Sequence, residues 1–176
     1  KAKPGRPTGI ALVPTRELAT QVRDELLPLA HARGIRITAI YGGDPIEKQI
    51  KALKAGVDLA VCTPGRAIDL IERGDLSVED VKNVIIDEAD RMADMGFLPQ
   101  VEWILRNVEV GHQTLLFSAT LDGAVDTLVR RYQHEPARHE VESKGATVEQ
   151  MTHRFITVHE MDKAKVAATI AIASGR

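Results

Sequence analysis

Cysteine, aromatic residues and long apolar runs are scarce in this sequence of 176 residues. The one cysteine, Cys62, excludes an internal disulfide, and its place in the apolar run 57–62 favours a buried strand residue over a reactive thiol. No stretch has the length and apolarity of a membrane-spanning helix. Residues 1–7 are basic, but no apolar core follows them, so they do not form a secretory signal. These absences predict a cytoplasmic protein without a membrane contact.

An excess of positive charge is also absent. The 23 Lys and Arg residues face 25 Asp and Glu residues, which gives a formal net charge of -2. Binding of nucleic acid through overall charge requires clustered Lys and Arg, so any such contact here depends on backbone amides and a few placed arginines. The content of 44% hydrophobic and 27% charged residues is typical of one globular domain.

Short apolar runs rich in Val and Ile alternate with amphipathic stretches of helix length over the first two-thirds of the chain. This alternation is typical of repeated strand–helix units. The predicted strands cover residues 9–13, 35–41, 57–62, 84–87 and 114–117. The predicted helices cover residues 15–32, 45–54, 64–73, 97–107 and 122–132, and three of them are followed by Gly34, Gly56 and Gly74. We therefore predict an α/β fold with a doubly wound, mainly parallel sheet flanked by helices, with ligands at the carboxyl ends of its strands.

The pattern changes after Tyr132, where Glu135-Pro136 breaks the helix and residues 142–145 are polar. Farther on, residues 151–158 alternate like a strand and residues 161–173 follow a helical pattern, but they are too few for a core of their own. We predict a domain over residues 1–135 and a linker over residues 136–150. Residues 151–176 are then either the start of a second domain or an appended strand–helix unit.

Two adjacent acids end the fourth predicted strand, where residues 84–90 read Val-Ile-Ile-Asp-Glu-Ala-Asp. Asp87 and Glu88 follow an apolar strand, and charge in such a place requires compensation. Mg²⁺ supplies it, since this ion prefers a carboxylate and waters beside substrate phosphates. One acid would hold the hydrated metal while its neighbour polarises an attacking water. The alternative is that both acids cap the following helix.

Three other segments follow predicted strands and combine helix starts, glycine and arginine. They are Pro14, Thr15, Arg16 and Glu17 after the first strand, Gly42 and Gly43 after the second, and Thr63, Pro64, Gly65 and Arg66 after the third. Free N–H groups at helix starts receive phosphates, and glycine allows close backbone approach. The ordinary explanations are helix capping by Thr15, a plain turn at Gly42-Gly43 and a solvated Arg66.

Ser118-Ala119-Thr120 ends the last apolar strand with two hydroxyl groups. These hydroxyls are suited to hydrogen-bond Asp90 and so to connect the acids to the strand ends. The alternative is an ST-turn that caps the next helix.

In their order along the chain, these segments resemble the motifs of the DEAD-box helicase family. Asp87-Glu88-Ala89-Asp90 spells the family's name, and residues 14–21, 42–43, 63–66 and 118–120 resemble its RNA-contacting and coupling motifs. The resemblance covers about residues 8–132. It implies a RecA-like domain of an ATP-dependent RNA helicase, with ATP and Mg²⁺ as cofactors and RNA bound with little sequence preference. It also implies catalytic or coupling roles for Asp87, which would hold Mg²⁺ through water, and for Glu88, Asp90, Ser118 and Thr120. Residues 14–17, 42–43 and 63–66 would contact the RNA backbone.

The sequence departs from this family in lacking a Gly-x-x-x-x-Gly-Lys-Ser/Thr phosphate loop and most of a second domain. We therefore predict that the first RecA-like domain is partial, and that the full-length parent hydrolyses ATP while these residues alone do not. A central strand before that loop would also be absent, leaving two strands with open edges that invite dimerisation or strand exchange. Two alternatives stay open: a non-catalytic RNA-binding module, and a DNA-directed helicase, which residues 14–21 fit poorly.

Overall fold

The computed structural model describes residues 2–121, 123–140 and 155–173. The chain forms two compact units, Lys1–Pro136 and Ala137–Arg176, and each is described by itself.

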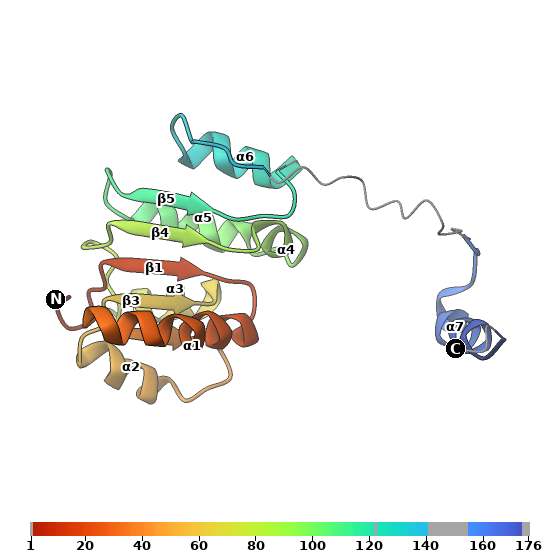
Figure 1. Cartoon of the computed structure of the whole chain (residues 1–176), viewed down its shortest axis with the longest axis horizontal. Coiled ribbons are helices and arrows are strands. Elements are labelled where there is room, and N and C mark those ends of the chain that lie inside the picture. The colour runs from red at the N-terminus through yellow and green to blue at the C-terminus, as the bar shows by residue number, and fades with distance from the viewer. Residues whose placement is uncertain (1, 122, 141–154, 174–176) are drawn as a thin grey trace. The chain divides into compact units, whose positions relative to one another are not determined.

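Five parallel strands form one continuous sheet in the first unit (Figure 1). They are β1 (Gly9–Leu12), β2 (Ile37–Ile40), β3 (Leu59–Cys62), β4 (Asn83–Ile86) and β5 (Gln113–Leu116). Their spatial order is β2-β3-β1-β4-β5, and every neighbouring pair is parallel. The predicted parallel α/β fold is confirmed. The two strands with an open edge are the outermost ones, β2 and β5. Strand β1 lies at the centre of the sheet and pairs directly with both β3 and β4.

Six helices connect or follow these strands in the described part of the first unit. They are α1 (Arg16–Arg33), α2 (Ile46–Lys54), α3 (Pro64–Glu72), α4 (Ala89–Asp94), α5 (Leu98–Asn107) and α6 (Gly123–Tyr132). Sequence periodicity predicts all of them except α4, which has six residues and no side-chain cap at its start. Gly34 ends α1 in the left-handed conformation, with φ of 63°, as its position after the helix predicts.

Strand side chains alternate between two apolar clusters on opposite faces of the sheet. The larger cluster joins residues such as Leu12, Val84 and Ile86 to the buried faces of α2 through α6. The smaller cluster packs Val13 and Val61 against Ala19 of α1. Complete burial of a Val, Leu or Ile side chain contributes about 1.5–3 kcal/mol, so these clusters hold the strand ends rigidly in place.

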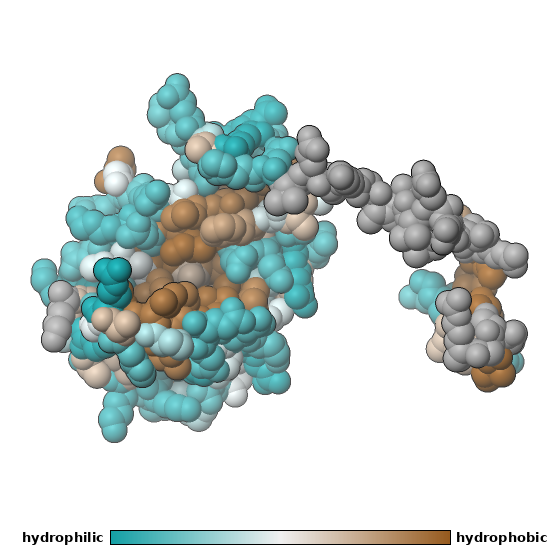
Figure 2. Space-filling model, viewed as in Figure 1, coloured by the Kyte–Doolittle hydropathy of each residue, from teal (hydrophilic) through white to brown (hydrophobic). Residues whose placement is uncertain are grey.

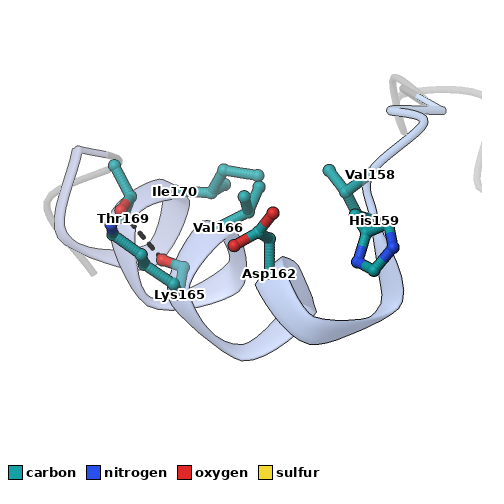
Figure 3. Close-up of a pocket in the computed structure, with 7 residues that line it drawn as sticks. All are labelled: Val158, His159, Asp162, Lys165, Val166, Thr169 and Ile170. Carbon is teal, nitrogen blue, oxygen red and sulfur yellow. Dashed lines mark hydrogen bonds between the residues drawn. The ribbon is translucent and has the colours of Figure 1, made fainter.

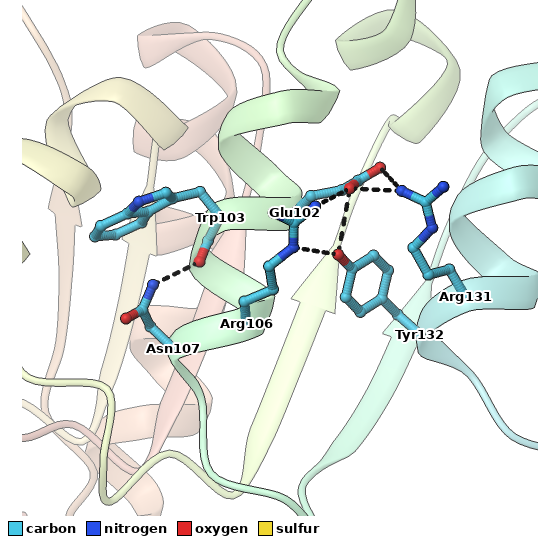
Figure 4. A network of polar contacts seen from close by, with 6 residues as sticks. All are labelled: Glu102, Trp103, Arg106, Asn107, Arg131 and Tyr132. Atoms are coloured by element: carbon cyan, nitrogen blue, oxygen red, sulfur yellow. Dashed lines mark hydrogen bonds and ion pairs between the residues drawn. The ribbon is translucent and has the colours of Figure 1, made fainter.

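A polar network joins α5 to α6 on the surface (Figure 4). The Glu102 carboxylate accepts hydrogen bonds from Arg106 Nη2 at 2.7 Å and Arg131 Nη1 at 2.8 Å. The hydroxyl of Tyr132 donates to the same carboxylate at 3.3 Å and accepts from Arg106 Nε at 3.0 Å. Because Arg131 and Tyr132 end α6, this network ties the last helix of the unit to the layer beneath it.

One face of the sheet carries exposed apolar surface, which Figure 2 shows in brown between α1 and α6. Helix α1 packs on β2 and β3 on this side. Ile85 and Leu115 alternate with residues of the larger cluster and are only half-buried, and Phe117, after β5, is 53% exposed. Strands β4 and β5 are therefore only partly covered on this face.

The second unit contains the short 3₁₀ helix η1 (Glu160–Asp162) and α7 (Lys163–Ala173), which confirms the helix predicted over 161–173. The predicted strand over 151–158 is not formed at 155–158, since no strand in the described part of this unit pairs with it; residues 151–154 lie outside the described residues. Most of the predicted linker, residues 141–150, also lies outside them. No helix in the described ranges has the length and apolarity to cross a membrane.

Candidate active site and nucleic-acid interface

The ends of the five strands bring the predicted site segments onto one edge of the sheet. Leu12 is in register with Cys62 and Ile86, Cys62 with Ile40, and Ile86 with Leu116, so all five strands end at the same level. Following the strands across the sheet, the edge carries residues 42–43, 63–66, 14–17, 87–90 and 118–120. The segments predicted to contact RNA therefore occupy one half of the edge, and the acids and hydroxyls occupy the other half.

Asp87 sits half-buried at the end of β4 and is tied to its neighbours through the backbone. Its N–H donates to the Leu12 carbonyl at 3.0 Å, and its Oδ1 accepts from the Glu88 N–H at 3.0 Å. Burial is the main cause that raises the pKa of Asp87; the hydrogen bond from Glu88 opposes it, and the charge of Glu88 adds to it. A negative charge at this position is therefore costly until a cation compensates it.

The donor set at this edge fits a magnesium ion held through water and not a cage of protein ligands. Among the described residues, no group of three or more His, Cys, Asp or Glu side chains gathers around one point. Mg²⁺ commonly keeps several waters and takes one or two carboxylates together with substrate phosphates. Asp87, whose charge burial disfavours, has the chemistry for such a ligand.

Glu88 has an unusual backbone, with φ of 50° and ψ of 52°, in the left-handed region that non-glycine residues rarely adopt. Such a conformation costs about 1–2 kcal/mol and persists where the surroundings enforce it, often at functional sites. Glu88 precedes α4, yet its side chain makes no capping bond to that helix. Its Oε2 instead pairs with Arg91 Nη1 at 3.1 Å. The capping alternative therefore does not account for this acid.

Ser118 connects the end of β5 to the start of α4. Its Oγ donates to Asp90 Oδ1 and accepts from the Asp90 N–H, both at 3.1 Å. Thr120, predicted to act with it, is exposed and makes no hydrogen bond to Asp90 in the described structure. A cleft of about 470 Å³ lies here and is lined by Asp87, Glu88, Asp90, Arg91, Phe117, Ser118 and Ala119.

The segment 14–17 opens α1 beside the acids. Thr15 Oγ1 accepts from the Leu18 N–H at 3.2 Å, so its hydroxyl caps the helix as the ordinary explanation expects. Pro14 is buried, and the exposed Arg16 donates from Nε to Glu17 Oε1 at 2.6 Å. Nη1 of Arg16 lies 3.9 Å from the position that a β-carbon at Gly43 would occupy. The structure thus brings segments 14–17 and 42–43 together.

Arg66 links the turn after β2 to the helix after β3. Its side chain is only 15% exposed, and its Nη1 donates to the Asp44 carbonyl at 3.1 Å. Its Nε lies 3.7 Å from Asp69 Oδ2. Thr63 precedes α3 without a side-chain capping bond, and Pro64 takes the first helical position. Arg66 is therefore a fixed cation at this edge and not a solvated one.

The family follows from sequence comparison, which agrees with this arrangement. The sequence model of the DEAD/DEAH box helicase family matches residues 1–128. The chain belongs to this family. The DEAD-box ATP-dependent RNA helicase CshA of Geobacillus kaustophilus is 44% identical over 154 residues, and CshA of Streptococcus pneumoniae is 42% identical over 154 residues. Each alignment covers 88% of this chain, but only 33% and 29% of those relatives, so the chain spans about a third of their length.

Solved structures of the DEAD-box family share the RecA-like fold of the first unit. The crystal structure of a DEAD box protein from Methanococcus jannaschii matches with a TM-score of 0.69 and 44% identity, over 74% of this chain and 36% of that one. The yeast DEAD-box splicing factor Prp28 matches with a TM-score of 0.68 and 33% identity, over 72% of this chain and 30% of that one.

Gln49 of α2 is a further candidate of this DEAD-box site that the sequence motifs do not point to. Its side chain is 4% exposed, and its Nε2 donates to the Tyr41 carbonyl at 2.9 Å, directly before Gly42-Gly43. Its Oε1 is buried without a hydrogen-bond partner among the described residues. The spacing of residues along α2 could have indicated this role. Gln49 lies on the apolar face of the helix with Ile46 and Leu53, where an amide without a hydrogen-bond partner is costly. The turn needs glycine at position 43, where φ is 88°, and the hydrogen bond from Gln49 to Tyr41 supports this turn.

A second hollow lies in the other unit, where η1 and α7 meet (Figure 3). It has a volume of about 360 Å³ and is lined by Val158, His159, Asp162, Lys165, Val166, Thr169 and Ile170. It contains none of the residues that the DEAD-box motifs supply.

Proposed function

We propose that this chain is the acid-bearing part of the first RecA-like domain of an ATP-dependent RNA helicase. The observation that carries the proposal is the shared edge: acids follow β4, and three segments suited to phosphates follow the adjoining strands β1, β3 and β2. Relatives that match 88% of the chain are named DEAD-box ATP-dependent RNA helicases. Residues 1–135 are then the partial first domain, 136–150 its linker, and 151–176 the start of the second domain or an appended unit.

ATP and Mg²⁺ are the proposed cofactors, and each acid has a different role toward them. Asp87 would hold hydrated Mg²⁺, which supplies charge compensation for the phosphates when bound. Glu88 polarises the attacking water through its carboxylate. Asp90 is hydrogen-bonded to Ser118, so it couples nucleotide binding and hydrolysis at the acids to the segment that follows β5. Thr120, exposed and unbonded to Asp90, is the least supported member of this set.

RNA is the proposed partner, held through its sugar-phosphate backbone with little sequence preference. Arg16 and Arg66 supply cations. The segments Pro14-Thr15 and 63–65 lie at the starts of α1 and α3, where free backbone N–H groups can bind a phosphate. Gly42 and Gly43 are exposed and admit close approach of the strand. Because the chain has no net positive charge, these local contacts carry the affinity.

Replacement of Gln49 by methionine is expected to weaken RNA binding about three- to tenfold, since one hydrogen bond that sets the Gly42-Gly43 turn is lost. Methionine has a similar length and removes the unpaired buried carbonyl, so the midpoint of urea denaturation should change little. Fluorescence anisotropy with labelled single-stranded RNA measures the affinity. A matched control is Gln113→Met, since Gln113 is exposed at the start of β5, at the edge of the sheet opposite the site. Loss of stability with unchanged affinity would contradict this role for Gln49.

The proposed function is tested by steady-state ATP hydrolysis of the full-length protein with and without single-stranded RNA. We expect turnover that RNA stimulates and that single-stranded DNA stimulates less. The 176-residue chain alone is expected to be inactive, and RNA-stimulated turnover by it would refute that part of the proposal. RNA binding by the full-length protein without any turnover would favour the non-catalytic binding module.

We also propose a cytoplasmic protein whose isolated 176-residue chain self-associates. The exposed apolar surface beside β4 and β5 and the open edge of β5 support this proposal, since unpaired strand edges pair with other chains. Light scattering across a dilution series should show a mass that rises with concentration. A monomer at every concentration would contradict it.

A further inference from the structure

Helix α6 connects residues 118–120, which follow β5, to the polar network between α5 and α6. It begins at Gly123 and ends at Tyr132, which belongs to that network. It packs on α4, which carries Asp90, and on α5, which carries Glu102. A helix of ten residues is about 15 Å long, so the network acts on residues 118–120 only through the position of α6.

The segment before α6 is held to the acids by directional bonds. The Ala89 N–H donates to the Phe117 carbonyl at 3.1 Å. Ser118 Oγ donates to Asp90 Oδ1 and accepts from the Asp90 N–H, both at 3.1 Å. Hydrogen bonds need a donor–acceptor distance near 3 Å and a nearly straight angle, so a shift of about 1 Å at Ser118 is enough to break its contact with Asp90.

The apolar contacts of α6 do not by themselves fix its orientation. Val125 and Leu128 are buried in the larger cluster. Burial of apolar surface is non-directional: it is favourable in any arrangement that removes the same area from water. These two side chains therefore set how deeply α6 lies on the layer beneath it, and they restrain its rotation and its position along its own axis less strongly.

The polar network supplies directional contacts at the end of α6 (Figure 4). Arg131 Nη1 lies 2.8 Å and 3.1 Å from the two carboxylate oxygens of Glu102. The Tyr132 hydroxyl donates to the same carboxylate and accepts from Arg106 Nε, and Arg106 Nη2 also donates to Glu102. Two neighbouring residues of α6 thus bond to one carboxylate of α5, which fixes the rotation of the last turn.

Glu102 is partly shielded from water, with a side chain that is 18% exposed. Burial acts to raise its pKa, but the hydrogen bonds and charges of Arg131 and Arg106 outweigh burial, so the pKa of Glu102 is lowered. The carboxylate is therefore ionised and holds both arginines through charge-assisted bonds. Gln133, directly after α6, adds a bond from its Nε2 to the Thr114 carbonyl of β5 at 3.3 Å.

We propose that Arg131 and Glu102 are positioning residues for Ser118: they fix α6 so that the Ser118 hydroxyl stays on Asp90, and ATP hydrolysis is then converted into separation of RNA strands. This inference rests on the proposed function, in which the contact between Ser118 and Asp90 couples the acids to the segment that follows β5. Neither Arg131 nor Glu102 belongs to the segments proposed to contact nucleotide or RNA. Without the network, α6 turns about its apolar contacts, and the bond to Asp90 is populated less.

The test compares Arg131→Gln with Arg130→Gln in the full-length protein. The two arginines are neighbours on α6 and lose the same charge, but Arg130 pairs at 2.8 Å with Asp126, one turn earlier on the same helix. We expect Arg131→Gln to lower the number of RNA duplexes separated per ATP hydrolysed about three- to tenfold, the range for loss of one hydrogen bond. Its ATP turnover should stay close to that of wild type, because the acids are intact. Arg130→Gln should match wild type in both measurements.

A double-mutant cycle with Ser118→Ala separates positioning from a general loss of stability. Changes more than about 10 Å apart that share no partner usually add their effects. If Arg131 acts through Ser118, its loss has no further effect once the Ser118 hydroxyl is removed, so the double variant should match Ser118→Ala alone. Additive losses of duplex separation per ATP, or equal losses in Arg131→Gln and Arg130→Gln, would overturn the inference.

Tyr132→Phe gives a milder perturbation of the same network, since it keeps every charge and removes only the hydroxyl between Arg106 and Glu102. We expect a smaller loss of duplex separation per ATP. If Arg131→Gln loses its circular dichroism signal, this variant decides, and an unchanged yield overturns the inference. A Ser118→Ala variant with the wild-type yield would overturn the coupling role of Ser118, and the inference with it. A wild type without RNA-stimulated hydrolysis would instead overturn the proposed function.

Discussion

Replacement of Glu88 by glutamine in the full-length protein is expected to reduce ATP hydrolysis by about two to four orders of magnitude, the usual contribution of a general base. Glutamine has the same shape as glutamate and occupies the same left-handed backbone position, so the turn at the start of α4 should persist. What is lost is the carboxylate that accepts the proton of the attacking water. Nucleotide binding does not depend on that proton and should remain within a few-fold of wild type.

The measurement pairs phosphate release at saturating ATP with the binding of a fluorescent ATP analogue. A matched control is Glu79→Gln, since Glu79 is also an exposed acid paired with an arginine, Arg6, with 2.7 Å between the charged atoms. Glu79 lies before β4, at the edge of the sheet opposite the acids, so its substitution should leave turnover near wild type. Retained turnover in Glu88→Gln would move the water-polarising role to another residue.

The position of the acids at the sheet edge follows from the sequence with few assumptions. The run Val84-Ile85-Ile86 is apolar on both faces, which predicts a strand covered on two sides, and Asp87 comes directly after it. The predicted site segments all follow strands, and parallel strands joined by helices end at one edge. The register of Leu12 with Ile86 and of Ile86 with Leu116 confirms that geometry.

Features that depend on tertiary contacts are beyond such a prediction. Helix α4 is short and lacks a capping side chain, so packing of Met92 into the larger cluster, and not local propensity, holds it. The Oγ of Ser118 reaches Asp90, whereas the hydroxyl of Thr120 does not, although both follow the same strand. The contact between Arg91 and Glu88 depends on the left-handed turn at Glu88, which no residue-type preference indicates. Sequence thus predicts which residues reach the edge, and packing decides which of them meet.

The largest effect on stability is expected for Ile86→Ala, at about 2–5 kcal/mol of unfolding free energy, because the removed atoms leave a cavity in a close-packed cluster. Ile86 is fully buried in β4, between β1 and β5, and the next residue is Asp87. Ile86→Val removes one methylene group and should cost only about 0.5–1.5 kcal/mol. Urea denaturation followed by circular dichroism measures both values.

Leu29→Ala on α1 is the matched control, since Leu29 is 65% exposed and its truncation should change the unfolding free energy by less than about 0.5 kcal/mol. Equal costs for Ile86→Ala and Leu29→Ala would show that β4 is not the packed centre of this unit. The dependence of unfolding free energy on urea concentration should be unchanged in all three variants, since the surface exposed on unfolding is nearly the same. Because Asp87 is held by the backbone bond to Leu12, a cavity beneath it should also slow hydrolysis in the full-length protein, even though Ile86 touches neither nucleotide nor water.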